Sequence, residues 1–289
     1  MRPLQNKTRQ IFFILGVVIF LVAAPIFVFY SLGFRINFKQ QSVHSTGGIF
    51  IHSWTVNGNY ILNGINRGGS SLLDRSQFFQ GLPEGIYNLK MLRDGYTAWE
   101  KNIPVIKEHV IDVSPFIIPL EPNTTEITKT IKDPNTLKIT TNPLYKVVAD
   151  LFVDKKKIDS SITVDTTIPV GAIELHKMLL YPDGDTLYAK WTGEKEVAPG
   201  YFCISIDVCN LVIPVLSPYE ENMHFDFYPG RNDIFIVNLT DGIYAIEFDT
   251  RGGQNRELVY SGNDLTFRID ENEKLYVKNK DHYYEIELK

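Results

Sequence analysis

The sequence lacks the motifs that identify the common classes of enzyme. It contains no Gly-x-Ser-x-Gly nucleophile motif, no phosphate-binding Gly-Lys-Ser/Thr loop and no dinucleotide-binding glycine pattern. No two histidines have the His-x-x-x-His spacing of a metal-binding helix. Each of the six is expected to be a surface or strand residue: His44, His52, His109, His176, His224 and His282. These absences predict a protein that is not an enzyme and that binds no cofactor or metal.

Basic clusters and a second long apolar run are also missing. Residues 1–39 contain five basic residues and no acidic one, and the whole chain carries a net charge of −5, so the other 250 residues sum to −10. An acidic body without a Lys/Arg cluster has nothing with which to bind phosphate backbones, which excludes nucleic acid as a partner. The chain is also expected to cross a membrane no more than once.

One long apolar run is present, near the N-terminus. Residues 11–30 are apolar apart from Gly16 and Pro25, and about 20 such residues span a bilayer as a helix. A buried core helix is the first alternative, but such helices are usually shorter and apolar on one side only. A cleaved signal peptide is the second, but Pro25 would follow the cleavage site and the run exceeds the usual ~7–15 residues. We therefore expect a retained transmembrane helix over residues 11–32.

The basic residues predict the orientation of this helix. Arg2, Lys7 and Arg9 precede it, whereas Arg35 and Lys39 follow it, so the positive-inside rule favours a cytoplasmic N-terminus. Residues 1–10 are then a cytoplasmic tail, 33–46 a juxtamembrane segment, and the rest lies outside the cytoplasm. A sensor that signals through the helix is disfavoured, because about ten residues cannot form a cytoplasmic output domain.

Short strands and turns are predicted from residue 47 onward. Asn63-Gly64, Leu82-Pro83-Glu84-Gly85 and Asp94-Gly95 are turn sequences, and they separate runs in which apolar and polar residues alternate. We expect strands within residues 49–53, 60–62, 87–91, 96–106, 109–113 and 116–120. Turn signals about every 8–12 residues predict a small antiparallel β-sandwich over residues 47–121.

These residues resemble the PEGA domain, a small β-sandwich of exported and surface-attached bacterial and archaeal proteins. The resemblance rests on the Gly-Ile-Phe-Ile strand at 48–51, Leu62-Asn63-Gly64, the run Leu82 to Tyr87, and Asp94-Gly95-Tyr96 with Trp99-Glu100. It covers about a quarter of the chain. Residues 53–59 replace the Pro-Glu-Gly-Ala of the family, and 68–71 replace its Gly-x-Thr-Pro. The order of helix, PEGA-like module and β-rich remainder is similar to envelope proteins of small-genome bacteria.

Residues 122–136 contain two prolines and few apolar residues, which predicts a linker. A loose repeat follows within residues 137–289, at 180–188, 227–235 and 269–276, with an apolar strand, a polar turn and a second strand in each copy. The copies lie 41 to 47 positions apart, close to the ~40–50-residue period of propeller blades. The whole chain is therefore expected to be mainly β: a transmembrane helix, a small antiparallel β-sandwich and a partial or small β-propeller-like domain.

Three features are candidate sites. Cys203 and Cys209 are the only cysteines; they either form a disulfide across a hairpin that turns at 206–207, or lie too far apart on one continuous strand. Trp54, in a predicted turn, is the aromatic residue most suited to contact a ligand, although tryptophans also fill sandwich cores. Asp183-Gly184-Asp185 offers oxygen ligands for Ca²⁺ but lacks further carboxylates, so a plain turn is favoured.

These features predict a membrane-anchored, non-enzymatic envelope protein. Membrane lipid is its partner through the helix, and its extracytoplasmic β modules bind a cell-surface polymer or a protein. The alternative is a structural or assembly subunit that docks onto a larger envelope complex. A long apolar edge strand in the C-terminal half would favour docking, whereas an exposed aromatic cluster near Trp54 would favour ligand binding.

Overall fold

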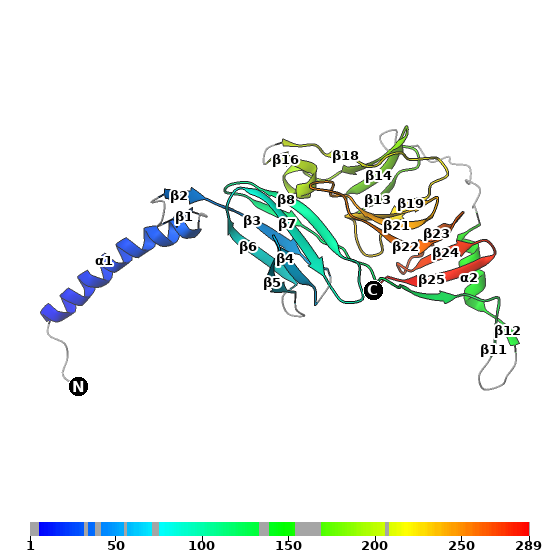
Figure 1. The fold of residues 1–289 in the computed structure, drawn as a ribbon, viewed down its shortest axis with the longest axis horizontal. Helices are drawn as coiled ribbons and strands as arrows, with labels where there is room; N and C mark the ends of the chain where they lie inside the picture. The colour runs from blue at the N-terminus through cyan, green and yellow to red at the C-terminus, as the bar shows by residue number, and fades with distance from the viewer. Residues whose placement is uncertain are drawn as a thin grey trace.

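The protein is mainly β, with one N-terminal apolar helix. The computed structural model describes residues 6–31, 34–37, 42–54, 57–70, 75–132, 139–153, 169–205 and 208–288. Among these residues the strands form several small sheets, and none of them closes into a barrel. Figure 1 shows helix α1 at one end of the molecule, a pair of sheets in the middle and a stack of sheets at the other end.

Helix α1, Asn6–Ser31, contains the apolar run. The most apolar 18-residue stretch within Lys7–Tyr30 has a mean hydropathy of 3.1, and none of that stretch is buried by the rest of the chain. The helix is therefore long and apolar enough to span a membrane. Within the predicted juxtamembrane segment, β1 (Phe34–Asn37) and β2 (Ser42–Ser45) pair as an antiparallel hairpin.

The N-terminal β unit, defined here as residues 47–119, contains two sheets that share one core. One sheet has the strand order β6-β3-β9 and the other the order β5-β4-β7-β8. The strands are β3 (Gly47–His52), β4 (Asn59–Leu62), β5 (Ile65–Gly69), β6 (Ser76–Leu82), β7 (Gly85–Leu92), β8 (Trp99–Val105) and β9 (Val110–Val113). The predicted tight turn at Asn63-Gly64 is confirmed, since both residues have positive φ between β4 and β5. Strands β5 and β6 were not predicted.

Two expectations for this unit were wrong. The unit is not wholly antiparallel, because β9 pairs with β3 in parallel. The turn at 106–109 carries the chain from β8 to the other sheet and passes close to Gly47. A Cβ on residue 47 would lie 2.2 Å from the Ile106 carbonyl oxygen, so this close approach requires glycine. The expected strand at 116–120 is absent: Pro115 and Pro119 lack the N–H groups that a strand donates, and one isolated bridge forms there.

The C-terminal β unit, defined here as residues 169–288 together with β10, contains three four-stranded antiparallel sheets. Their orders are β13-β14-β15-β18, β19-β20-β21-β22 and β23-β24-β25-β10. The strands of the first are Ile173–Leu175, Met178–Asp183, Thr186–Trp191 and Val212–Leu216. Those of the second are Phe225–Phe227, Ile234–Leu239, Gly242–Glu247 and Arg256–Ser261. Those of the third are Thr266–Ile269, Leu275–Asn279, His282–Glu287 and Asn123–Glu126. Each repeated turn motif joins two paired strands: β14 and β15, β19 and β20, and β23 and β24.

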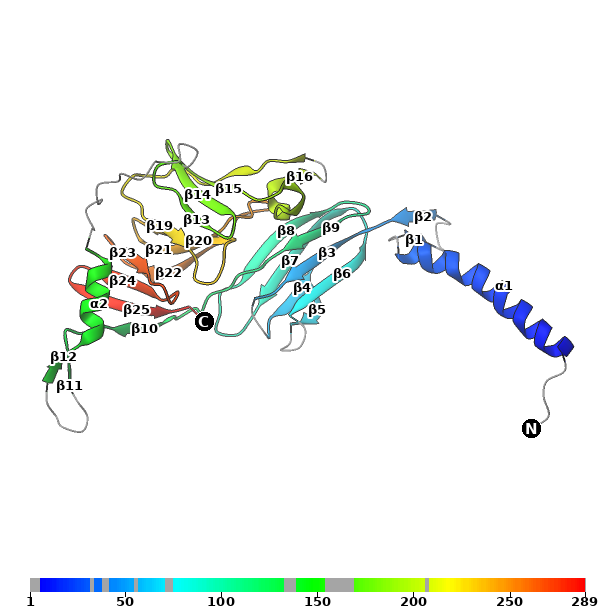
Figure 2. The ribbon, with the colours of Figure 1, turned by 180° about the vertical axis from the view of Figure 1, so that it is seen from behind.

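The middle of these sheets is buried on both faces. Phe235 and Val237 of β20 pack with the first sheet, whereas Ile234 and Ile236 pack in a core shared with the third sheet and the N-terminal unit. This arrangement explains why β20 is a continuous apolar run instead of an alternating one. Figures 1 and 2 both show this sheet between the other two. Because one buried cluster contains residues of both units, the units share a hydrophobic core.

The segment predicted as a linker is in part a strand. Its first residues form β10, which pairs with β25 and completes the third sheet. The side chains of β10 are exposed and polar, so composition gives no strand signal. The backbone of β10 covers the edge of β25, and the side chains of Asn123 and Glu126 bind Glu287 and His282. Beyond it, β11 (Thr130–Lys132) pairs with β12 (Ile139–Thr141), and an unpredicted helix, α2 (Pro143–Leu151), begins at the Asn142 cap and packs Val148 against the third sheet. Residues 133–138 lie outside the described ranges.

Candidate functional site at the junction of the two β units

The junction is centred on a buried lysine. Strand β8 alternates strictly between buried and exposed residues, and the buried set includes Trp99, Lys101 and Ile103. The alternation therefore turns a charged side chain inward, where Lys101 is 2% exposed. A buried ammonium group is costly unless an opposite charge and hydrogen-bond acceptors surround it.

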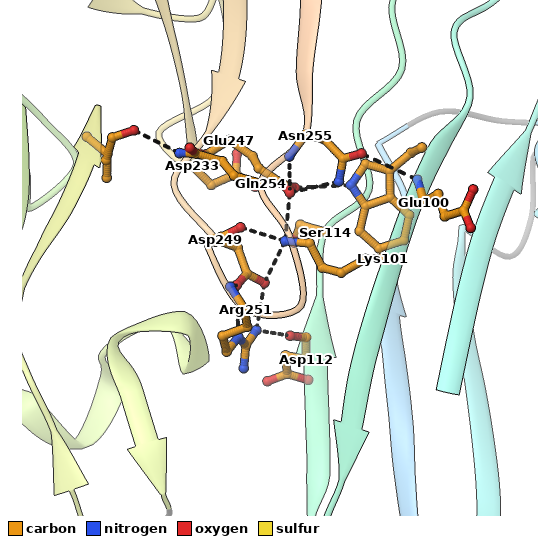
Figure 3. Close-up of polar contacts among 12 residues, drawn as sticks. Glu100, Lys101, Asp112, Ser114, Asp233, Glu247, Asp249, Arg251, Gln254 and Asn255 are labelled. Carbon is orange, nitrogen blue, oxygen red and sulfur yellow. Dashed lines mark hydrogen bonds and ion pairs between the residues drawn. The ribbon is translucent and has the colours of Figure 1, made fainter. Parts of the chain in front are cut away.

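Two carboxylates of the C-terminal unit meet this ammonium group. Lys101 Nζ lies 2.6 Å from Glu247 Oε1 and 3.5 Å from Asp249 Oδ2, and it donates to the Asp249 carbonyl oxygen at 2.6 Å. Glu247 ends β21 and Asp249 follows two residues later, so one strand end supplies all three acceptors. Figure 3 shows both acidic side chains converging on the amine.

Other donors also bind the two carboxylates. Glu247 Oε1 accepts the backbone and side-chain N–H groups of Asn255, both at 2.8 Å, and Oε2 accepts the indole N–H of Trp99 at 3.1 Å. Asp249 accepts the Arg251 guanidinium on both oxygens, at 2.9 Å each. Burial raises the pKa of Glu247 and outweighs the opposing charge of Lys101. Burial also acts to raise the pKa of Asp249, but the hydrogen bonds and charge of Arg251 lower it overall.

Backbone contacts reinforce this ion cluster. Strand β8 is the edge of its sheet, and the loop after β21 covers that edge: Asn102 N donates to the Gly252 carbonyl at 3.3 Å, and Glu100 N donates to Asn255 Oδ1 at 3.4 Å. Gly252 has a φ of +64°, and a Cβ there would lie 1.7 Å from the Asn102 carbonyl oxygen. Only glycine fits this approach, and the two units are in direct backbone contact as a result.

A second ion pair, within the C-terminal unit, also contacts the N-terminal unit. Arg231 is 7% exposed and makes a two-pronged bond to Asp233, with contacts of 2.8 Å and 2.6 Å. The same guanidinium donates to the backbone carbonyls of Ser114 and Pro115 in the N-terminal unit, at 3.2 Å each. It also lies 5.3 Å from the ring centroid of Trp54. A residue of the C-terminal unit therefore makes a cation–π contact with a tryptophan of the N-terminal unit.

A cleft lies between these two ion pairs. It consists of two adjoining cavities, of about 280 Å³ and about 410 Å³. The two cavities share five lining residues, which come from both units: His52, Ser114, Pro199, Tyr201 and Asp233. We call this the junction cleft. Trp54 and Arg75 line the larger cavity, and burial raises the pKa of Tyr201 well above its ordinary value.

The predicted site residues lie in different places. Trp54 is 56% exposed on the wall of the junction cleft. Cys203 and Cys209 are joined by a disulfide between β16 (Cys203–Ser205) and β17 (Val208–Cys209), and the proposed turn at 206–207 lies outside the described residues. Asp183 ends β14 and Gly184 has a positive φ, as in a tight turn. No group of three metal-ligating side chains occurs in the part of the chain that the structure describes.

Sequence reasoning missed the ion cluster, although one signal was present. Lys101 stands in phase with Trp99 and Ile103, and a lysine on the apolar face of an alternating strand indicates a buried charge that needs a partner.

No protein-family model matches the chain, and no curated protein matches it. The function is therefore inferred from the geometry of the junction.

Proposed function

We propose that the chain is a non-enzymatic, single-pass envelope protein that binds a cell-surface polymer or protein in the junction cleft. The observation that carries the proposal is Trp54, an exposed indole on the wall of the junction cleft that makes a cation–π contact with the buried Arg231. An exposed tryptophan beside a cleft is the usual anchor of a binding site, because its large rigid ring loses little conformational entropy on binding.

The anchor and the orientation belong to this proposal. Helix α1 is long and apolar enough to span a bilayer, and the basic residues before it favour a cytoplasmic N-terminus. The β units then lie outside the cytoplasm. The disulfide between Cys203 and Cys209 supports this location, since disulfides persist in oxidising compartments.

The fold of the two units also belongs to the proposal. The two sheets of the N-terminal unit form a sandwich similar to the PEGA domain. The three stacked sheets of the C-terminal unit are blades of an open, partial propeller. Its third blade takes its fourth strand, β10, from the N-terminal side of the unit, so the first and last strands of the unit pair with each other.

The internal pairing of the ion cluster supports a binding role over catalysis. A general acid or base must reach the proton that it moves on a substrate. Glu247 and Asp249 already accept bonds from Lys101, Trp99, Asn255 and Arg251 in the described arrangement. These groups are suited to hold the walls of the cleft at a fixed separation.

The edge strands favour ligand binding over assembly through an added strand. Among the described four-stranded sheets of the C-terminal unit, the edge strands are short, polar or interrupted by proline: β13 and β19 have three residues each, β23 has four, β18 contains Pro214, β22 carries Arg256 and Glu257, and β10 is polar throughout. Such edges are protected against pairing with another chain. A subunit that docks by edge pairing would need a longer, apolar edge.

Affinity capture tests the proposal. The full-length chain is immobilised in detergent and exposed separately to envelope polysaccharide and to solubilised membrane proteins. We expect retention of one fraction, with Trp54→Ala reducing it and Ile86→Ala leaving it unchanged. Ile86 is the matched control because it is an exposed apolar residue (73% exposed) on the other sheet of the same unit. Retention of neither fraction would refute the binding function.

A further inference from the structure

A row of rings leads to the junction cleft. In β3 and the two residues after it, Ile49, Ile51 and Ser53 are buried, whereas Phe50 is half-buried and His52 and Trp54 are exposed. Alternate residues of a strand are about 7 Å apart and point to the same face. The Phe50 and His52 rings touch edge to face, with 4.6 Å between their centroids. The three side chains therefore form a row along the outer face of β3 and the residues that follow it.

The neighbouring strand widens this row. Phe78 of β6 stands opposite Phe50 in the strand register, with 6.2 Å between ring centroids, and it is 48% exposed. Ser76 stands opposite His52 and lines the cleft. We define Phe50, His52, Trp54 and Phe78 as the aromatic track. Its far end opens into the larger cavity, because His52 and Trp54 are part of the cavity wall.

The cleft supplies hydrogen-bonding groups beside the rings. Its walls contain the hydroxyl groups of Ser114 and Tyr201, the amide of Asn232 and the imidazole of His52. These groups include donors and acceptors. A ligand that fits the track and the cleft together needs a flat apolar face and a rim of hydroxyl or amide groups.

The free charges of the cleft cancel. Among the described lining residues, the carboxylates of Glu247, Asp249 and Asp233 are held in ion pairs. Arg75 and Asp112 are the exposed charged side chains outside these described pairs, one of each sign. A polyanion such as a phosphate-rich polymer would gain little at this surface, and neither would a polycation. A neutral ligand matches this balance.

We propose that the aromatic track and the junction cleft bind a neutral glycan chain, a deepening that rests on the binding function proposed above. A pyranose ring carries C–H groups on its faces and hydroxyl groups around its rim. The C–H faces stack on Trp54, Phe50 and Phe78, and the rim hydroxyls bind the polar groups of the cleft. Linked sugars extend along β3, so several rings of one chain are held at once.

A protein partner fits the track less well than a glycan. The track spans only two strands, β3 and β6, and leads to a polar cleft, whereas a stable protein interface buries about 800 Å² per partner around an apolar centre. The Trp54 ring is more than half exposed, with the Arg231 guanidinium 5.3 Å from its centroid. A flat exposed ring beside hydrogen-bonding groups is suited to a small rigid unit such as a sugar.

Binding of defined oligosaccharides tests the proposal. Full-length protein in detergent is titrated with neutral β-1,4-linked hexasaccharides of glucose and of N-acetylglucosamine, and with a polyanionic hexasaccharide of galacturonate. We expect a neutral hexasaccharide to bind and to change the tryptophan fluorescence. Trp54→Ala and Phe50→Ala should each weaken binding roughly tenfold or more. Ile86→Ala, on the other sheet, should change it less than twofold.

The outcomes separate this inference from the binding function. If the immobilised protein retains a membrane protein or a charged polymer and no neutral hexasaccharide binds, the glycan assignment is overturned and the binding function stands. If a neutral hexasaccharide binds equally well to wild type and Trp54→Ala, the aromatic track is not the site. If neither envelope fraction is retained and no oligosaccharide binds, both proposals fail.

Discussion

Replacing Lys101 by methionine should separate the buried ion cluster from ordinary surface ion pairs. Methionine keeps most of the volume of the lysine stem, so the packing of β8 is preserved and the ammonium group is lost. Glu247 then loses its ammonium partner in a buried position, with its side chain 5% exposed. Removing one partner of a buried ion pair costs about 3–5 kcal/mol because the remaining charge is uncompensated.

The contacts around Glu247 place the expected loss at the lower end of this range. Trp99 and Asn255 continue to donate to the carboxylate, and Asp249 keeps its pairing with Arg251. We therefore expect Lys101→Met to lower the free energy of unfolding by about 3 kcal/mol. The double variant with Glu247→Gln removes the orphaned charge, so the two substitutions should couple by about 1 kcal/mol or more.

Chemical denaturation of the full-length protein in mild detergent measures these values, with tryptophan fluorescence as the signal. The Trp99 indole donates to Glu247 and so reports directly on the junction. Lys90→Met is the matched control: the Lys90–Glu100 pair has a similar distance of 2.9 Å, but its side chains are 40% and 48% exposed. We expect that control to cost less than about 1 kcal/mol. Equal effects of Lys90→Met and Lys101→Met would refute the role assigned to the buried cluster.

Three further predictions concern other parts of the fold. Gly252→Ala should destabilise the protein by several times the cost of Gly184→Ala, since the two glycines have similar positive φ values but only Gly252 lies against a backbone carbonyl; denaturation curves compare them. Burial lowers the pKa of His224 to about 4, below the ~6.5 of the unfolded chain, so protonation favours unfolding. Stability should therefore fall by about 3 kcal/mol between pH 6.5 and 4 from this group, and His224→Gln should remove that part of the slope. Alkylation of the unreduced, unfolded protein should leave Cys203 and Cys209 unmodified in a mass spectrum, and labelling of both would show free thiols.

Local sequence signals predicted the turns between neighbouring strands and the N-terminal helix. The dipeptide Asn63-Gly64 needs only its own backbone preference to form the turn between β4 and β5. The three repeated turns of the C-terminal unit are equally local, since each joins strands adjacent in sequence. The apolar run of α1 is also a local property.

Long-range contacts account for what was missed. Strand β10 is polar and exposed, and it is a strand because β25, more than 150 residues away, offers a free edge. The Trp99–Glu247 hydrogen bond joins residues 148 positions apart, and no local pattern identifies that partner. The proline-containing segment after β9 is apolar and buried, so it resembled a strand although its prolines prevent one. The buried phase of Lys101 was the exception, because it is visible in the alternation of β8 alone.

Labelling in intact cells tests the central claim, that the β units lie outside the cytoplasm, most directly. The Ile86→Cys variant places a thiol at a position that is 73% exposed, far in sequence from the disulfide. A membrane-impermeant maleimide is added before or after lysis, and the wild-type chain is the control for the native cysteines. We predict full labelling of the variant in intact cells and none of the wild type. Labelling of the variant only after lysis would contradict the proposed orientation.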